Sequence, residues 1–565
     1  MKSINGINWK VRNIPERLIL KHKQNFNISY LLSKIFLDKK YTDEEVHNSL
    51  YKNIKSKISY RNKDFEYASK LLIENLNMKK KILIFGDYDV DGYSSTYLLH
   101  DYFKSQNIDC NYYIPDRLLD GYGPNKLLLK KLIFSDNYGL VIFVDCGSNS
   151  INEIDYLESE GLNSIIIDHH QIYESKQFKK SVIINPLKDS ISKNKTFFCA
   201  TTLVYFFIEY LSKNLKRNNV VDLKKYLFFA AIATICDQMP LRNLNKSIVL
   251  NGFDNFKINQ FINLKKIINI KRKLSSTDIA FSLGPILNSA SRLGYSNLPI
   301  SLLIENKNNN IDKITKKLII LNERRKKIQK KSFELLNLNF KENKNKVIFE
   351  YKENINEGLL GIIAANYVEL YNKPSFILTN SGNFIKCSSR SIYGYDIGNI
   401  FYHSAKKNLI VKGGGHSMAG GCILENHKLN SFKKFLNEYY EKKFRPYENI
   451  KFYISEQNID SLIKFAKEDL QYLEPLGNNN SSPFFFLKAN KIFKIKIIKG
   501  AHLQLVIINK LKKSCICFAF NSVGTKLGEL LMNCKKEIDL IVQINNKFVQ
   551  KNSDFNLIIK DAIAW

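Results

Sequence analysis

Aspartate and histidine residues stand at the ends of several apolar runs in this 565-residue sequence. In KILIFGDYDVDG, Asp87, Asp89 and Asp91 follow directly after the apolar residues. The stretches LVIFVDCG, SIIIDHH and ATICDQMPL also place acid or histidine residues at or near their ends. The full set is Asp87, Asp89, Asp91, Asp145, Asp168, His169, His170 and Asp237. Side chains of these types could act together as the ligands of a metal centre.

The expected chemistry of such a centre is phosphodiester hydrolysis. Side chains just beyond the carboxyl ends of strands in an α/β sheet converge on one crevice. Carboxylates gathered there repel one another when ionised, and divalent cations relieve that repulsion. Carboxylate oxygens combined with imidazole suit Mn²⁺ or Mg²⁺. Two such ions, about 3.5–4 Å apart, activate water and hold the attacking and leaving oxygens of a phosphodiester.

Each of these sites has a simpler explanation when it is taken alone. A single aspartate at a strand end is usually a turn residue or a helix cap. Alternating aspartates can form a calcium loop, but DYDVDG lacks the later glutamate that completes an EF-hand. The occurrence of all the sites in one chain, each after an apolar element, favours a shared metal centre.

The elements that must position these residues alternate between strand and helix. Unbroken apolar runs, including SVIINP further along, suit strands of a parallel sheet that helices cover on both faces. The stretch 94–107 predicts a helix with Ser94 or Ser95 as its N-cap. The stretch 222–237 predicts a buried helix that ends at Asp237.

Changes of pattern along the chain predict a mostly helical N-terminal segment, two α/β domains and a final β-barrel. Five short, often alternating apolar segments near the end suit a small barrel, and an OB-fold is the natural candidate. The expected divisions are 1–80 (helical), 81–308 (catalytic domain), 309–345 (long connecting helix), 346–445 (second α/β domain) and 450–565 (barrel).

The composition indicates which kinds of partner and which cellular compartment suit the protein. The 86 Lys and Arg residues outnumber 53 Asp and Glu, giving a charge of +33 that suits a polyanion such as nucleic acid. Lys, Asn, Ile, Phe and Tyr are abundant, which also fits an A/T-rich genome, so charge alone does not decide the substrate.

No apolar run suits a membrane helix, no secretory signal is recognisable, and the nine cysteines form no CxxC pair. We expect a cytoplasmic protein with reduced thiols.

The motifs DYDVDG, VDCG and DHH, followed by the later Asp237, resemble the four signature motifs of the DHH phosphoesterase superfamily. Within it, the resemblance is strongest to bacterial single-stranded-DNA-specific 5′→3′ exonucleases. Later segments are also similar to those enzymes, including their DHH-associated domain and OB-fold: GPILNSASRLG (284–294), EGLLGIIAANYVELYNKPSFIL (357–378), KCSSRSI (386–392), KGGGHSMAGG (412–421) and EPLG…PFF (474–485).

The resemblance implies two Mn²⁺ or Mg²⁺ ions, whose ligands fall into a main group and a supporting group. Asp145 would bridge the ions. The residues expected to be both catalytic and metal-binding are Asp89, Asp91, Asp145, His169 and Asp237. Further ligands, or neighbours that orient ligands, would be Asp87, Asp168 and His170.

The resemblance also implies a set of substrate-binding residues. Asn288 and Arg292 stand four apart and would share one face of a helix that meets the DNA backbone. Arg390 can hold a phosphate oxygen bidentately, and the glycines before His416 permit close approach of backbone to phosphate. The expected set is Asn288, Arg292, Ser388, Arg390, Gly414, Gly415 and His416.

Two positions depart from the pattern of these exonucleases. Ser291 stands where they usually have glycine, and Asn356 where they usually have histidine. Asparagine can donate a hydrogen bond but cannot take up a proton, so a proton-transfer role at that position is in question.

The predicted function is hydrolysis of single-stranded DNA from its 5′ end to 5′-mononucleotides, in DNA repair and recombination. The OB-fold would hold the strand by basic strands and stacked aromatics. A single-strand-binding protein and a helicase are candidate partners, and a monomer without membrane contact is expected. One alternative is a DHH enzyme for short oligonucleotides or cyclic dinucleotides, against which residues 450–565 argue. Another is a non-catalytic DNA-binding scaffold, against which the intact carboxylates argue.

Overall fold

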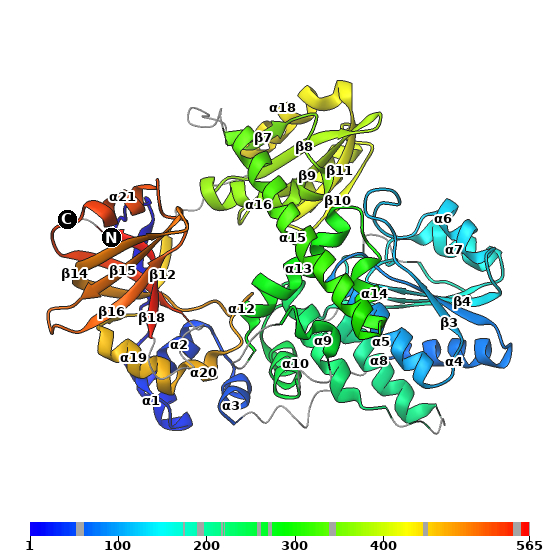
Figure 1. Cartoon of the computed structure of the whole chain (residues 1–565), viewed down its shortest axis with the longest axis horizontal. Helices are drawn as coiled ribbons and strands as arrows, with labels where there is room; N and C mark the ends of the chain where they lie inside the picture. Colours follow the sequence, from blue (N-terminus) through cyan, green and yellow to red (C-terminus); the bar gives the residue numbers. More distant parts are fainter. Residues whose placement is uncertain are drawn as a thin grey trace.

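The computed structural model contains three sheets of five or six strands and one two-stranded sheet. Figure 1 shows two α/β parts and a barrel, with the N-terminal helices beneath the barrel. Among the described helices, none is long and apolar enough to cross a bilayer. The residues that the structure describes are 1–51, 62–172, 176–188, 197–215, 219, 221–256, 261–268, 274–337, 346–443, 450–545 and 555–563.

A parallel sheet with the strand order β3-β2-β4-β5-β6 forms the centre of the first α/β part. Along β2, Ile82 and Ile84 join one hydrophobic cluster while Leu83 and Phe85 join another, so the strand is buried on both faces. The sequence prediction of a parallel sheet is therefore confirmed. The strands are β2 (Lys81–Phe85), β3 (Cys110–Tyr113), β4 (Tyr138–Val144), β5 (Asn163–Ile167) and β6 (Ser181–Ile184).

Helices cover both faces of this sheet. Residues of α6 (Lys126–Ile133) and α7 (Ile151–Ser159) share the core with Leu83 and Phe85. The helices in the cluster with Ile82 and Ile84 are α4 (Asp64–Asn77), α5 (Val90–Ser105), α8 (Ala200–Asn214), α9 (Leu223–Cys236) and α10 (Asn243–Asp254).

The ends of two helices test the sequence predictions. Helix α9 ends at Cys236 with Asp237 as its C-cap, as expected. The prediction of Ser94 or Ser95 as an N-cap is wrong, because α5 already begins at Val90. The carboxylate of Asp89 accepts hydrogen bonds from the backbone N–H groups of Asp91 and Gly92 and so caps the helix itself.

A run of helices leads from this sheet to the second α/β part. It comprises α11 (Ile262–Lys265), α12 (Ser276–Asp278), the π-helical turn η3 (Ile279–Leu283), α13 (Gly284–Arg292), α14 (Leu298–Ile304) and α15 (Asn308–Asn337). Helix α15 has 30 residues and covers most of the predicted connecting segment, whose residues 338–345 lie outside the described ones. At about 1.5 Å per residue, α15 is roughly 45 Å long.

The second α/β part has a mixed sheet with the order β10-β11-β9-β8-β7. Only its β7–β8 pairing is parallel among the described strands. The strands are β7 (Ile348–Tyr351), β8 (Ser375–Ser381), β9 (Phe384–Arg390), β10 (Lys412–Gly415) and β11 (Ala419–Glu425). The helices are η4 (Glu357–Leu359), α16 (Leu360–Tyr371), α17 (Ile397–Lys406), η5 (Asn426–Lys428) and α18 (Leu429–Lys443).

The last sheet, with the order β13-β14-β15-β16-β18-β17, closes into a barrel through an additional β14–β17 pairing. The five predicted segments form its long strands, and the OB-fold prediction is confirmed. The strands are β13 (Glu456–Gln457), β14 (Phe485–Ile498), β15 (His502–Ile508), β16 (Ser514–Ala519), β17 (Ile538–Ile544) and β18 (Asn556–Ile563). The associated helices are α19 (Ile459–Glu468), α20 (Leu470–Leu473) and α21 (Lys526–Asn533).

The first fifty residues pack on the barrel, whereas α4 packs on the parallel sheet. Strand β1 (Asn8–Val11) pairs in parallel with β12 (Ile450–Tyr453), and the buried Trp9 indole N–H donates to Asp561 Oδ2 at 2.8 Å. Both chain ends therefore lie beside the barrel (Figure 1). The remaining N-terminal helices are α1 (Glu16–Phe26), α2 (Tyr30–Asp38) and α3 (Asp43–Tyr51).

A buried lysine joins the first α/β part to this N-terminal and barrel assembly. The Lys246 ammonium on α10 donates to Ser49 Oγ and to the Tyr472 carbonyl, each at 2.9 Å. Nearby, Arg242 forms an ion pair with Glu45. Burial lowers the pKa of Lys246 from 10.5 to about 7, since the low dielectric disfavours the charged form.

The buried Lys246 predicts a pH-dependent stability. Between about pH 7 and 10.5 the unfolded lysine keeps its proton while the folded one loses it. The unfolded state then binds more protons, so the free energy of unfolding rises with pH. We expect wild type to gain stability relative to Lys246→Met over this range, by up to about 1.4 kcal/mol per pH unit. Denaturant unfolding at pH 7, 8 and 9 measures the difference, and parallel profiles for the two proteins would contradict it.

Candidate active site

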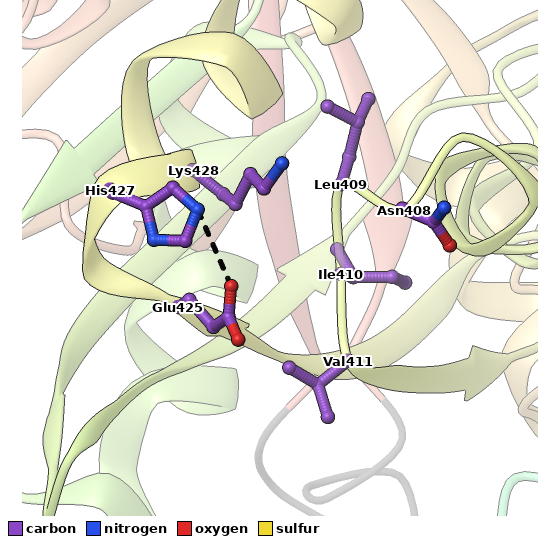
Figure 2. Close-up of a pocket in the computed structure, with 7 residues that line it drawn as sticks. All are labelled: Asn408, Leu409, Ile410, Val411, Glu425, His427 and Lys428. Carbon is purple, nitrogen blue, oxygen red and sulfur yellow. Dashed lines mark ion pairs between the residues drawn. The ribbon is translucent and has the colours of Figure 1, made fainter.

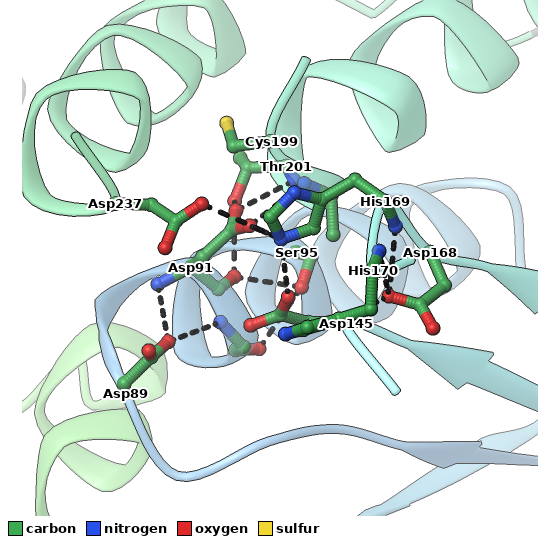
Figure 3. Close-up of polar contacts among 12 residues, drawn as sticks. Asp89, Asp91, Ser95, Asp145, Asp168, His169, His170, Cys199, Thr201 and Asp237 are labelled. Atoms are coloured by element: carbon green, nitrogen blue, oxygen red, sulfur yellow. Dashed lines mark hydrogen bonds and ion pairs between the residues drawn. The ribbon is translucent and has the colours of Figure 1, made fainter. Parts of the chain in front are cut away.

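The predicted acidic and histidine residues converge at the carboxyl edge of the parallel sheet. Asp87, Asp89 and Asp145 offer oxygen atoms that all lie within 4.8 Å of one another. The same limit holds for Asp91 with His169 and Asp237, and for a group formed by Asp145, Asp168, His169 and His170. Figure 3 shows most of these side chains around one centre. All eight residues predicted to bind metal thus belong to one cluster.

The N-terminus of helix α8 holds Asp91 in place. Asp91 is fully buried, and its carboxylate accepts from the backbone N–H groups of Ala200 and Thr201 at 2.7 and 2.8 Å. The Thr201 hydroxyl donates to the same carboxylate at 2.6 Å. These donors favour the ionised form, but burial and the charge of Asp89 outweigh them and raise the pKa of Asp91 to about 6.

His169 stands between three carboxylates. Its Nε2 lies 3.2 Å from Asp145 Oδ1, 3.4 Å from Asp237 Oδ2 and 3.7 Å from Asp91 Oδ2. Burial, followed by the neighbouring charge of His170, lowers the pKa of His169 to about 3. The ring is therefore neutral near pH 7, which is the form that binds metal.

Asp145 adopts an unusual backbone conformation beside this ring. Its φ of 63° lies in the left-handed region, which costs a non-glycine residue free energy. The position follows β4 directly, where the chain turns away from the sheet. The residue with this strained backbone is also the one whose carboxylate lies nearest to His169 Nε2, compared with Asp91 and Asp237.

Asp168 is already occupied by protein hydrogen bonds. Its Oδ1 accepts from the His169 N–H at 2.7 Å and lies 2.7 Å from His170 Nδ1, while Oδ2 accepts from the Ser148 N–H at 3.0 Å. Burial disfavours both charges of the pair, but Asp168 raises the pKa of His170 to about 9. In this geometry Asp168 orients the two histidines.

Four buried atoms of the cluster make no hydrogen bond within the described part of the chain. They are Asp87 Oδ1, Asp145 Oδ1, His169 Nε2 and Asp237 Oδ2. Burial, followed by repulsion from neighbouring carboxylates, raises the pKa of Asp145 and of Asp237, and raises that of Asp87 to about 8. Unpaired oxygen and imidazole atoms in a region of excess negative charge are what divalent cations require. The residues present therefore fit Mn²⁺ or Mg²⁺.

An arginine cluster accompanies the acidic centre. Arg292 lies on α13 and Arg390 ends β9, in the other α/β part. Burial, then repulsion from Arg117, Arg390 and Arg325, lowers the pKa of Arg292 to about 9. A half-buried group of like charges indicates a binding site for an anion.

Arg117 and Arg325 were not identified from the sequence. Arg117 follows β3, so its place after a strand of the parallel sheet was an available signal. Its guanidinium carbon lies 4.8 Å from the centroid of the Tyr88 ring, inside the first aspartate motif. Arg325 belongs to the long helix α15, and its many charged neighbours in sequence gave no reason to select it.

The other predicted substrate-binding residues of α13 and β9 lie near these arginines. Asn288 is one helical turn before Arg292, and its Oδ1 is buried without a partner among the described residues. A Cβ atom placed on Gly361 would lie 3.1 Å from both Ser388 Oγ and Arg390 Nη2, so the start of α16 covers these two side chains. Ser291 is accommodated in α13, where its hydroxyl donates to the Asn288 carbonyl at 3.3 Å.

The GGGH segment forms strand β10 and brings the second α/β part to the metal cluster. The His416 ring lies 6.1 Å from that of His170, with an angle of 16° between the ring planes. Gly414 is open, since a Cβ there would meet nothing within 4 Å. A Cβ on Gly415 would lie 2.3 Å from the Ala419 carbonyl oxygen, so Gly415 is required by packing against β11. Gly414 is thus better placed for backbone approach of a ligand.

Tyr122 is a further site residue that the sequence analysis missed. Its hydroxyl lies 3.2 Å from His170 Nδ1 and 3.4 Å from the Asp145 carbonyl oxygen. It stands between Gly121 and Gly123, both with positive φ, in the loop after β3. An aromatic residue flanked by glycines at a strand end was the available signal.

A separate hollow of about 380 Å³ lies in the second α/β part (Figure 2). It is lined by residues 408–411 with Glu425, His427 and Lys428. His427 Nε2 lies 3.4 Å from Glu425 Oε2, and both side chains are exposed. None of the predicted site residues lines this hollow.

Comparison with known proteins identifies the class. Residues 81–234 match the DHH family, N-terminal domain, and residues 344–442 match the DHHA1 domain. These matches cover the parallel sheet with its first three acidic motifs and the sheet that carries Arg390 and His416. The two α/β parts are thus a DHH domain and a DHHA1 domain.

Residues 457–561 match the RecJ OB domain, so the chain carries a DHH, a DHHA1 and a RecJ OB domain in that order. It is 25% identical over 479 residues to the single-stranded-DNA-specific exonuclease RecJ of Bacillus subtilis (strain 168), covering 81% of this chain and 58% of that protein. For the RecJ of Haemophilus influenzae (Rd), identity is 26% over 430 residues, covering 71% of this chain and 74% of that protein. The match thus spans less than two thirds of the Bacillus relative.

The fold is also that of a solved structure. RecJ of Thermus thermophilus, in complex with Mn²⁺, gives a TM-score of 0.81 at 20% identity. The match covers 99% of this chain and 80% of the Thermus chain. The arrangement of both α/β parts and the barrel is therefore shared.

The unpaired Asp145 predicts opposite effects of one substitution with and without metal. Without metal, we expect Asp145→Asn to raise the melting temperature, because it removes a buried charge that neighbouring carboxylates repel. Mn²⁺ at about 100 times its Kd should stabilise wild type by about 2.7 kcal/mol and the variant much less. Thermal unfolding with and without Mn²⁺ measures both effects.

Asp155→Asn is the matched control, because Asp155 pairs with Lys176 on the exposed surface. It should leave the response to Mn²⁺ unchanged. Equal stabilisation of Asp145→Asn and wild type by Mn²⁺ would contradict the assignment of Asp145 as a ligand.

Proposed function

We propose that the chain is a metal-dependent exonuclease that degrades single-stranded DNA from its 5′ end and releases 5′-mononucleotides. The observation that carries the proposal is the pairing of two charged clusters, the carboxylates with unpaired atoms and the half-buried arginines around Arg292. A phosphodiester strand needs both, since cations assist its cleavage and arginines hold its phosphates. The activity carried by the names of the RecJ relatives supports this interpretation.

Two ions, Mn²⁺ or Mg²⁺, would be held by the acidic cluster. Its ligands would be Asp89, Asp91, Asp145, His169 and Asp237, with Asp145 as the bridging carboxylate. Bound ions would supply Lewis-acid activation of water and of the phosphodiester. Asp87 contributes an unpaired oxygen, and Asp168 with His170 orients the His169 side of the cluster.

The arginine cluster would hold the phosphate at the end of the strand. Arg292 and Arg390 come from different α/β parts, and Arg117 comes from the loop after β3. Fixing a terminal phosphate there would place the first internal phosphodiester next to the carboxylates. This arrangement would account for cleavage one nucleotide from the end. His416 and the open backbone at Gly414 would support the same strand from the second α/β part.

The barrel offers a surface for the rest of the strand. On its outer face Lys496, Gln504 and Phe518 form one row across β14, β15 and β16. Phe518 also stacks with the exposed Phe520, with ring centroids 5.8 Å apart and planes at 8°. Basic and aromatic side chains in such a row suit single-stranded nucleic acid without sequence preference.

The proposal also covers the cellular location, the oligomeric state and the partners of the protein. It includes a cytoplasmic monomer that acts in DNA repair and recombination, with a single-strand-binding protein and a helicase as partners. The domain limits at residues 81, 309, 346 and 450 belong to the same proposal.

A nuclease assay tests the proposal directly. With Mn²⁺, wild type should shorten a 3′-labelled single strand progressively from its unlabelled end and leave a blunt duplex intact, while Asp145→Ala should be inactive. Cleavage of short oligonucleotides or cyclic dinucleotides in preference to long strands would favour a different DHH phosphodiesterase. Binding of the strand by wild type without any cleavage would favour a scaffold, and equal activity of both proteins would contradict the metal assignment.

The arginine cluster predicts recognition of the strand end. We expect Arg292→Gln to lower affinity for a 5′-phosphorylated single strand by about 10- to 100-fold, since charge-assisted hydrogen bonds contribute about 1.5–3 kcal/mol. Affinity for the same strand with a 5′-hydroxyl should change little. Fluorescence anisotropy in EDTA measures both constants. Arg324→Gln is the control, because Arg324 is exposed on α15 beside Arg325, and it should preserve the preference for phosphate.

A further inference from the structure

Asn356 lies at the contact between the two α/β parts. It precedes the short turn η4, and its Oδ1 accepts a hydrogen bond from the Gly358 N–H at 3.0 Å. Its side chain therefore acts as the N-cap of η4. The residue stands where the resemblance predicts histidine, so its contacts show what an uncharged amide does there.

The capped turn presses directly against Arg292. The Arg292 Nη1–H group donates to the Gly358 carbonyl oxygen at 2.9 Å. A Cβ on Gly358 would lie 2.4 Å from the Arg292 carbonyl oxygen, so the turn touches the backbone of Arg292 as well as its guanidinium. One residue of the second α/β part thus contacts both ends of Arg292.

The same turn also borders the other arginine of the cluster. It continues into α16, whose Gly361 lies against Arg390 and Ser388. Glu357, inside the turn, forms an ion pair with Lys386 of β9 at 2.9 Å. The segment from Glu357 to Gly361 therefore lies as a spacer between Arg292 and Arg390.

Arg292 needs such a spacer because its neighbours repel it. Arg117, Arg390 and Arg325 all disfavour its charge, and partial burial removes some of the water that would otherwise solvate it. A half-buried guanidinium needs acceptors, and the Gly358 carbonyl is one that the protein supplies. The position of that carbonyl depends on the cap that Asn356 provides.

We propose that Asn356 is a positioning residue for the terminal phosphate: by capping η4 it fixes the Gly358 carbonyl and thereby the spacing of Arg292 from Arg390. The inference rests on the proposed function of the arginine cluster. An amide does not titrate, so this role is independent of pH, unlike that of a histidine at the same position. Asn356 contributes geometry to the site and no proton transfer.

The test compares 5′-phosphorylated and 5′-hydroxyl single strands in binding experiments with EDTA. Wild type should prefer the phosphorylated strand. Asn356→Ala should lower that preference about five-fold, since loss of an N-cap costs about 1 kcal/mol. Asn356→Ser should restore it, because serine caps helical turns about as well as asparagine. The preference of each variant relative to wild type should be the same at pH 6 and pH 8.

Asn458→Ala is the matched control. Asn458 caps α19 in the same way, accepting from the Ser461 N–H at 2.8 Å, and lies in the segment that leads into the barrel. It should lower thermal stability by an amount similar to Asn356→Ala while leaving the preference for phosphate intact. An equal loss of preference in both variants would overturn the inference, because general destabilisation would then explain it.

Arg292→Gln separates failure of the inference from failure of the proposed function. If Arg292→Gln loses the preference while Asn356→Ala keeps it, the inference is overturned and the phosphate site stands. If wild type itself binds both strands equally, the phosphate site of the proposed function is wrong and the inference falls with it.

Discussion

Mutual repulsion among buried carboxylates governs how this fold is built around the acidic cluster. Asp87, Asp91 and Asp145 are almost fully excluded from water and lie within one small cluster with Asp89. Such a group survives only if the fold holds each member rigidly. The parallel sheet fixes the positions at its carboxyl edge, and the first turn of α8 binds Asp91 through three hydrogen bonds. The strained backbone of Asp145 is stabilised by the same surroundings.

The cluster of positively charged arginines imposes a second electrostatic constraint on the structure. Arg292 reaches the Gly358 carbonyl across the contact between the α/β parts, and His416 faces His170 across the same contact. The two parts therefore meet through polar side chains, whereas each has its own hydrophobic core. A contact of this kind is more tolerant of small shifts than an apolar one. The geometry of the site then depends on a few polar anchors, among which Asn356 and Gly358 are prominent.

The parallel sheet and the acidic cluster could be predicted from the sequence. Unbroken apolar runs indicate strands that are buried on both faces, and the Asp or His residues at their ends indicate a functional edge of the sheet. The start of α5 was misassigned, because Asp89 was selected only as a metal ligand, whereas its carboxylate also caps the helix. Arg117 follows a strand of the parallel sheet, which was an available signal, whereas the importance of Arg325 arises only from its proximity to Arg292 in space. The packing of the first fifty residues on the barrel depends on contacts across most of the chain, which local patterns do not encode.

The packing of residues 1–51 on the barrel has a consequence for biosynthesis. Trp9 is synthesised 552 residues before its partner Asp561. During translation the N-terminal helices would expose the apolar faces of Leu32, Ile35 and Phe36 until the barrel has been made. The catalytic sheet, whose segments are close together in sequence, can fold much earlier. The nascent chain would therefore carry a folded parallel sheet while residues 1–51 still await the barrel, and a chaperone would find its longest-lived binding site on those helices.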